Sequence, residues 1–357
     1  MTIKGNKGEW TEIYVLLKLL ADGKLYAGDE NLGIISDIYS KVLRIDRKEK
    51  EGEYHYLRND KISILDSNGK VLVELDATVF NENAKKLLKE IKEAKGPSFS
   101  VSDVEEFMHI IKCKSLKAKS TQKSDITIQI SEPSNPLKVT LKFSIKSQLG
   151  RASTLLNPGK TTNFVYKIDA KSINKDELKS IDLQTNLKNK IKSLEIKGYN
   201  LIYDHIESEN FHSNLRLIES TLPEMVAAAL VKFYGGKFKT LKELTDELER
   251  INPLGYSKSG GQKPYEHKMK QLLYAAALGM TPGKIWEGEF EALGGYILVN
   301  KKGEVLGYTT HNQNKFMDYL LNNTKFEIAS RSRYKFGKIY SENGQYYTKL
   351  NLQIRFL

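Results

Sequence analysis

Cysteine is the scarcest residue type in this 357-residue chain, which contains one, Cys113. A single cysteine forms no disulfide within the chain and excludes a zinc site built from several cysteines, which fits a reducing cytoplasm. No apolar run approaches the ~18 residues that a membrane span requires, and the polar start MTIKGNKGEW lacks the pattern of a signal peptide. The sequence therefore predicts a cytoplasmic protein that does not enter a membrane.

Several catalytic motifs are missing too. The chain has no GxxxxGK[ST] loop, so ATP-driven translocation is not predicted. Its six histidines are scattered, and the pair His205 and His212 is followed by no further cluster, which argues against a zinc site. Cys113 lies in a run of lysines with no neighbouring base, so a cysteine nucleophile is not predicted either.

Positive charge, in contrast, is in excess. The chain has 56 Lys and Arg against 44 Asp and Glu, a formal charge of +12 and a pI near 9.3. This balance favours an anionic partner, either nucleic acid or an acidic membrane surface, and does not decide between them. The length allows a catalytic core with one or two further modules.

Both helices and hairpins are expected along the chain. Helical patterns and end signals predict helices over GEWTEIYVLLKLLADG, which ends at Gly23, ENAKKLLKEIKEAK, VSDVEEFMHIIK with a cap at Ser102, TLPEMVAAALVKFYGG, TLKELTDELERI and YEHKMKQLLYAAALGM. Apolar runs around turn residues predict hairpins over KISILDSNGKVLVEL and GGYILVNKKGEVLGY. The fold class is therefore α/β (α+β).

A third hairpin, DITIQISEPSNPLKVTLKFSIKS, carries polar residues in a suggestive order. Apolar residues alternate along both strands, so Asp125 lies on the polar face of one strand, while Ser144 and Lys146 lie on the polar face of the other. If the strands pair, these faces can coincide. An aspartate and a following lysine form the skeleton of the Asp-x(n)-(Asp/Glu)-x-Lys nuclease site, in which carboxylates hold Mg²⁺ and the lysine orients or activates water. Ser144 stands where that motif has an acid, and Lys146 could equally be a solvated lysine at a sheet edge.

The first helix offers a replacement carboxylate. Glu12 lies in a helix that is apolar nearly all round, with Glu9 one turn earlier. A carboxylate in such a setting has three explanations, namely a cap or dipole role, a salt bridge, or a metal. Gln148 is a further candidate for positioning water, with an ordinary surface glutamine as the alternative.

Two segments around the hairpin are rich in groups that bind phosphate. A run without acids precedes Asp125 and contains Lys112, Lys114, Lys117, Lys119 and Lys123, and a solvated loop or helix face is its usual interpretation. After the hairpin, GRASTLLNPGKTTNF combines hydroxyl and amide side chains with Arg151 and Lys160. This composition suits a loop that holds DNA phosphates, although a turn-rich connection fits it as well.

The C-terminal region is the best candidate for reading DNA sequence. From Ser330 onward a single acid, Glu342, faces six cationic residues interleaved with tyrosines: Arg331, Arg333, Lys335, Lys338, Lys349 and Arg355. IASRSRYKF predicts a strand on which Arg331 and Arg333 share a face, and paired arginine forks suit successive guanines in the major groove. Lys338 and Arg355 are further candidates for DNA contact, and a solvated basic strand is the alternative.

Three long blocks of the sequence carry a family resemblance. KGNKGEWTEIYVLLKLLADGKLYAGDENL, KFSIKSQLGRASTLLNPGKTTNFVYKI and SRSRYKFGKIYSENGQYYTKLNLQIRF resemble the signature blocks of the HpaII family of type II restriction endonucleases, and they span nearly the whole chain. The resemblance implies a PD-(D/E)XK-type nuclease core, with a mixed sheet flanked by helices, plus helical and C-terminal β-rich recognition elements. It also implies Mg²⁺-dependent cleavage of double-stranded DNA at CCGG.

The resemblance also assigns roles to individual residues. Asp125 would be the first metal ligand, Lys146 the catalytic lysine, and Ser144 the degenerate acidic position. Glu12 is our first choice to complete the metal shell, and the backbone carbonyl of Ile145 could also contribute.

We expect three consecutive segments: 1–110 with the first helices and hairpin, 111–215 with the nuclease core, and 216–357 with the recognition elements. The expected partners are double-stranded DNA, a second copy of the chain on a palindromic site, and a cognate methyltransferase as a genetic partner. The rival hypothesis is a non-catalytic DNA- or RNA-binding protein that uses the same basic surface, which Ser144 favours.

Overall fold

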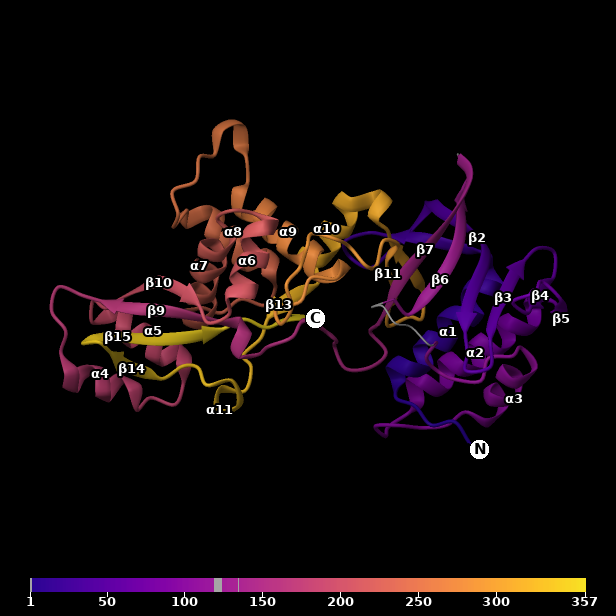
Figure 1. The fold of residues 1–357 in the computed structure, drawn as a ribbon, viewed down its shortest axis with the longest axis horizontal. Coiled ribbons are helices and arrows are strands. Elements are labelled where there is room, and N and C mark those ends of the chain that lie inside the picture. The colour runs from indigo at the N-terminus through magenta and orange to yellow at the C-terminus, as the bar shows by residue number, and fades with distance from the viewer. Residues whose placement is uncertain (1, 119–123, 134) are drawn as a thin grey trace. The chain divides into compact units, whose positions relative to one another are not determined.

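A computed structural model describes residues 2–118, 124–133 and 135–357, which form two compact units (Figure 1). Unit 1 comprises Met1–Ser153 and Phe290–Tyr319, and unit 2 comprises Thr154–Glu289 and Leu320–Leu357. This division differs from the three consecutive segments 1–110, 111–215 and 216–357. The chain re-enters unit 1 at residue 290 and adds two strands to the sheet that contains the hairpin of Asp125 and Lys146, so distant segments fold together.

Unit 1 is built on one mixed sheet. Its strands in the described residues are β1 (Lys24–Gly28), β2 (Ile34–Lys48), β3 (Glu53–Arg58), β4 (Ile62–Leu65), β5 (Val71–Leu75), β6 (Ile126–Glu132), β7 (Asn135–Ser147), β11 (Gly295–Val299) and β12 (Val305–Tyr308). Their order is β1-β12-β11-β7-β6-β2-β3-β4-β5, and β1 also pairs with β2. The first six strands in that order therefore close into a ring, which the sequence did not predict. The α/β class is confirmed.

Helix α1 (Lys7–Asp22) forms the centre of the core of unit 1. Asn6 and Glu9 make a reciprocal capping box at its start, and Gly23 ends it with a φ of 66°. Trp10, Ile13 and Leu17 are fully buried, as the apolar circumference of this helix predicts. The helix packs against α2 (Ala77–Glu93) and against the sheet. Its position places Glu12 near the end of β7.

The remaining helices of unit 1 are short. They are α3 (Ser102–Ile110), η3 (Thr310–Asn312) and the first part of α10 (Gln313–Asn322). The predicted cap at Ser102 is wrong. Ser102 is the first helical residue, Val101 takes the cap position, and no side chain caps the helix.

Unit 2 combines helices with two small sheets. Its helices are α4 (Lys175–Asp182), α5 (Leu187–Ile196), α6 (Glu209–Ile218), α7 (Leu222–Gly235), α8 (Leu241–Ile251), α9 (Pro264–Leu278) and α11 (Arg331–Tyr334), with short turns η1 (Lys160–Thr162) and η2 (Ser259–Gly261). One sheet has the order β10-β9-β15-β14, from β9 (Asn163–Asp169), β10 (Asn200–Ile206), β14 (Ile339–Glu342) and β15 (Gln345–Asn351). The other has the order β13-β16-β8, from β8 (Thr154–Leu156), β13 (Thr324–Phe326) and β16 (Ile354–Phe356). No helix within the described residues is long and apolar enough to cross a membrane.

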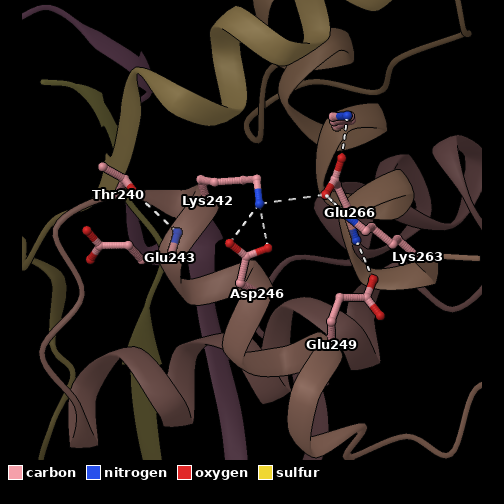
Figure 2. A network of polar contacts seen from close by, with 8 residues as sticks. Thr240, Lys242, Glu243, Asp246, Glu249, Lys263 and Glu266 are labelled. Atoms are coloured by element: carbon pink, nitrogen blue, oxygen red, sulfur yellow. Dashed lines mark hydrogen bonds and ion pairs between the residues drawn. The ribbon is translucent and has the colours of Figure 1, made fainter. Parts of the chain in front are cut away.

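Paired charges join α8 to α9 in unit 2 (Figure 2). Lys242 Nζ bonds both carboxylate oxygens of Asp246, at 2.5 and 2.7 Å, and lies 3.9 Å from Glu266 on α9. The backbone N–H of Glu266 donates to Glu249 at 3.0 Å. Lys263 and Lys270 also lie 3.7 and 2.6 Å from the Glu266 carboxylate, so these paired charges hold the two helices together.

Candidate active site

The pairing of β6 with β7 brings the predicted motif residues into contact. The backbone N–H of Asp125 donates to the carbonyl of Phe143 at 2.8 Å, which places Asp125 beside Ser144. Asp125 Oδ2 accepts from the backbone N–H of Ile145 at 2.7 Å and from Ser144 Oγ at 3.1 Å. Ser144 Oγ in turn accepts from Lys146 Nζ at 3.1 Å. Three side chains thus form one hydrogen-bonded row, Lys146–Ser144–Asp125.

Lys146 is held in a position where its charge is poorly solvated. Its Nζ lies 4.9 Å from the centroid of the Tyr296 ring, which packs against Phe316 of α10. Burial lowers the pKa of Lys146, and the nearby carboxylates of Asp125 and Glu12 oppose that effect. No carboxylate of the described residues forms an ion pair with this ammonium group. The charge of Lys146 therefore remains available to a ligand.

Glu12 reaches the same region from α1. Thr11 Oγ1 lies 3.1 Å from Ser147 Oγ, so the helix is fastened to the end of β7 one residue after the motif lysine. Burial, and next the charge of Asp125, raise the pKa of Glu12 to about 8, although Lys117 and Arg47 act in the opposite direction. Within the described part of the chain, the Glu12 carboxylate makes no hydrogen bond or ion pair. A partly buried carboxylate without a partner is costly, and a titratable group perturbed in this way inside a cleft is a candidate for a functional site.

Glu9 has a different explanation. Its carboxylate accepts from the backbone N–H of Asn6 at 2.9 Å and lies 3.3 Å from Lys117 Nζ. It therefore has the cap and the salt bridge that Glu12 lacks.

These groups line one cleft of about 1000 Å³ in unit 1. Its wall includes Glu12, Asp125, Ile145, Lys146 and Arg151, and it further includes Asn6, Lys7, Gly8, Glu9, Ala94, Lys95, Gly96, Pro97, Lys117, Ser147, Leu149, Gly150 and Ser153. Gln148 does not line it, and its backbone N–H donates to the carbonyl of Val299 at 2.9 Å. A second hollow of about 510 Å³ beside Tyr39 and His311 has no lysine or arginine among its described lining residues, so it lacks a cation to hold phosphate.

The residues at the cleft suit Mg²⁺ on the chemistry of their donors. Glu12 and Asp125 offer carboxylate oxygens, and Ile145, whose backbone carbonyl is the further candidate ligand, also lines the cleft. The described residues contain no group of three or more His, Cys, Asp or Glu arranged around a metal position. Mg²⁺ is commonly bound by one or two carboxylates, with water and substrate phosphate completing its shell, so two carboxylates fit this ion.

The predicted DNA contacts belong to two different units. Arg151 is exposed at the cleft in unit 1, whereas Lys160, exposed on η1, lies in unit 2. The predicted strand over IASRSRYKF is wrong. Arg331 and Arg333 lie on the four-residue helix α11, where residues two apart do not share a face.

The arginines and lysine of the C-terminal region also differ in their surroundings. Arg331 donates to the carbonyls of Thr185 and Gly337, and Arg355 forms an ion pair with Glu327 at 2.9 Å, so both are engaged within unit 2. Arg333 is exposed with its guanidinium 5.4 Å from the Tyr334 ring, and Lys338 is exposed as well. Arg333 and Lys338 remain the better candidates for DNA contact.

Sequence reasoning missed three lysines at the cleft as site residues, Lys7, Lys95 and Lys117. Lys117 belongs to the lysine run, whose members Lys119 and Lys123 lie outside the described residues. Its backbone carbonyl accepts from Ser115 Oγ at 2.7 Å, and the same hydroxyl bonds Glu49 at 2.6 Å. No local signal in the sequence indicates that these three lysines line one cleft.

Comparisons with known proteins cover nearly the whole chain. The family model described as HpaII restriction endonuclease matches residues 6–356. A relative from Haemophilus parainfluenzae named Type II restriction enzyme HpaII is 40% identical over 357 residues, which cover 99% of this chain and 98% of the relative. No solved structure matches the chain.

Proposed function

The chain belongs to the HpaII restriction endonuclease family, whose members are type II site-specific endonucleases acting on double-stranded DNA, and from that premise we propose that it hydrolyses DNA in a Mg²⁺-dependent reaction at CCGG. One observation supports the cleft as the place of the reaction. Lys146 and Asp125, the two ends of the row Lys146–Ser144–Asp125, line the same cleft as the partnerless Glu12.

We assign the core to the PD-(D/E)XK type. In support, β6 and β7 belong to a mixed sheet, α1 packs against it, and an aspartate precedes a lysine on paired strands. Ser144 occupies the acidic position of the motif, and Glu12 supplies the second carboxylate from the helix. Glu12, Asp125 and the carbonyl of Ile145 are the proposed ligands.

We assign each residue at the cleft a separate role in hydrolysis. Mg²⁺, when bound, supplies positive charge that polarises the phosphate and lowers the pKa of water. Lys146 orients the attacking water and stabilises the negative charge that grows on the phosphate oxygens. Ser144 holds Nζ of Lys146 in place, and its own hydroxyl is oriented by Asp125. Gln148 has no direct part, because it does not line the cleft.

We place recognition of the bases mainly in unit 2. The exposed Arg333 is proposed to read guanine, and Lys338 and Lys160 to hold phosphates. The palindromic target suits two copies of the chain related by a twofold axis. We further propose a cytoplasmic enzyme paired genetically with a methyltransferase that protects the same site. The family resemblance supports CCGG as the target, and the Haemophilus relative is by its name a type II restriction enzyme.

Plasmid DNA incubated with the purified protein tests the proposal. Discrete fragments in Mg²⁺, their loss in EDTA and their absence with Asp125→Asn are the expected results. Retarded but intact plasmid under all conditions would instead establish a binding protein without catalysis. Fragments whose ends do not map to CCGG would refute the target and leave the enzyme.

A further inference from the structure

The cleft has more positive charge than catalysis requires. Of the described residues that line it, five are cationic and three are carboxylates. Lys146 belongs to the catalytic row, and Lys117 is paired with Glu9. Lys7, Lys95 and Arg151 remain, and we call these three residues the basic wall.

Separate contacts build the basic wall from three distant segments. Gly5 and Phe99 exchange two backbone hydrogen bonds, at 3.0 and 2.9 Å, and Trp10 Nε1 donates to the carbonyl of Phe99 at 3.0 Å. The segment that contains Lys95 is therefore fixed beside the start of α1. Lys7 Nζ donates to the carbonyl of Lys92 at 3.3 Å, which joins the same two segments again.

The third segment is fixed by a close approach. A Cβ atom on Gly150 would lie 3.3 Å from the Cβ of Lys7, so the chain after β7 passes directly over the first turn of α1. The backbone N–H of Leu149 donates to Ser147 Oγ at 3.1 Å, and that hydroxyl contacts Thr11 on α1. Arg151 is therefore carried to the cleft by a turn with defined geometry.

The side chains of the wall are free to bind an anion. Lys95 and Arg151 are exposed and make no hydrogen bond or ion pair to any residue that the structure describes. The ammonium group of Lys7 uses one of its three N–H donors for the neutral carbonyl of Lys92, and no carboxylate of the described residues pairs with its charge. Like charges gathered at a cleft repel one another, and an anion removes that repulsion.

We propose that Lys7 and Lys95, together with Arg151, bind backbone phosphates of the DNA strand next to the phosphate that is cleaved. This inference rests on the proposed function for the position of the reaction, and it adds Lys7 and Lys95 to the DNA interface. The contacts are independent of base sequence, because phosphate carries no sequence information. They hold the strand in register with Lys146 and Asp125.

Salt dependence of binding separates these contacts from a structural role. We would measure affinity for CCGG and single-mismatch duplexes in Ca²⁺ across a salt series. Each lost phosphate contact should make the slope of log affinity against log salt less steep by about 0.9, so that wild type loses about 3.5-fold more affinity than the variant between about 50 and 200 mM salt. Lys95→Ala and Lys7→Ala should show this change equally on both duplexes.

Two matched variants serve as controls. Lys95→Arg keeps the charge and should keep the wild-type slope. Lys86→Ala removes a lysine that is exposed on α2 and does not line the cleft, so it should also keep that slope. Wild-type slopes for Lys95→Ala and Lys7→Ala, or losses confined to CCGG, would overturn the inference. If the wall variants flatten the slope while wild type fails to cut in Mg²⁺, the proposed function falls and the phosphate contacts stand.

Discussion

Replacement of Glu12 by Gln should make the protein more stable and inactive at the same time. The carboxyl of Glu12 has a pKa of about 8 in the folded chain, against an ordinary value of 4.5, mainly because it is buried. The stability linked to its proton is fully present below pH 4.5 and is lost as the pH rises to about 8, since the unfolded chain releases the proton first. At 1.36 kcal/mol for each pKa unit, the cost is about 3 kcal/mol at pH 7 and about 5 kcal/mol above pH 8.

Glutamine keeps the shape of the side chain and removes this cost. Without metal, Glu12→Gln should therefore unfold at higher denaturant concentration than wild type at alkaline pH, and the difference should shrink toward pH 5. Mg²⁺ should stabilise wild type more than the variant, because binding favours the ionised carboxylate and acts on the folded state alone. Cleavage should be abolished or strongly reduced at low Mg²⁺.

Glu9→Gln is the matched control one turn earlier on α1. It keeps the capping-box oxygen and loses the charge that faces Lys117 and the helix N-terminus, so it should lower the free energy of unfolding by about 0.5 kcal/mol and leave the dependence on Mg²⁺ close to that of wild type. Urea unfolding in EDTA at about pH 5, 7 and 9 measures the stabilities, and a Mg²⁺ titration of plasmid cleavage measures activity. A Glu12→Gln protein that is less stable than wild type at pH 9 would refute the cost assigned to the buried carboxylate, and one that cuts equally well would show that the second carboxylate lies elsewhere.

The other predictions concern the catalytic row and the recognition region. Lys146→Ala and Asp125→Asn should each abolish cleavage. Specific DNA binding by Lys146→Ala, measured in Ca²⁺, should stay within about tenfold of wild type, because the lysine acts chiefly on water and the transition state. Cleavage at the wild-type rate by either variant would contradict the role assigned to that residue. Ser144→Ala should slow single-turnover cleavage by about 10- to 100-fold, the value of one hydrogen bond to a charged group, and an unchanged rate would show that Lys146 needs no such support. Arg333→Ala should narrow the difference in affinity between CCGG and single-mismatch duplexes, whereas Lys338→Ala should weaken both in proportion. Equal losses for Arg333→Ala would assign that residue to the DNA backbone.

Local patterns predicted the elements that depend on local forces. Alternating residues from Asp125 to Ser147 indicated paired strands, and Gly23 marked the end of α1, where the chain does adopt a positive φ. Such signals survive because side-chain alternation and end caps act within a few residues. The prediction of a strand for Arg331 and Arg333 was wrong because a single helical turn such as α11 is too short to show a periodic pattern. Its position is instead fixed by hydrogen bonds from Arg331 to the carbonyls of Thr185, which is distant in sequence, and Gly337, which lies beyond the turn.

Features that depend on contacts between distant segments could not be predicted from the sequence. The closure of the strand ring by β1 and β2 requires β11 and β12, which lie more than a hundred residues beyond β7. Lys7 and Lys95 each resemble an ordinary solvated lysine in the sequence. The β-bridge between Gly5 and Phe99 brings the two lysines to one cleft, and no periodic pattern in the sequence predicts this bridge.

The serine at the acidic position of the motif favours an exchange of roles over a loss of catalysis. A hard cation is held by oxygen atoms at suitable distances, and it makes no difference which element supplies them. Because Thr11 contacts Ser147, the carboxylate of Glu12 reaches the cleft beside the end of β7. Ser144 then performs a task that an ionised acid could not, since a hydroxyl can donate to Asp125 and accept from Lys146 together, whereas a carboxylate only accepts. In the proposed site, Glu12 on α1 supplies the acid that β7 lacks, so the absence of one acid from β7 and the unpaired acid on α1 are explained together.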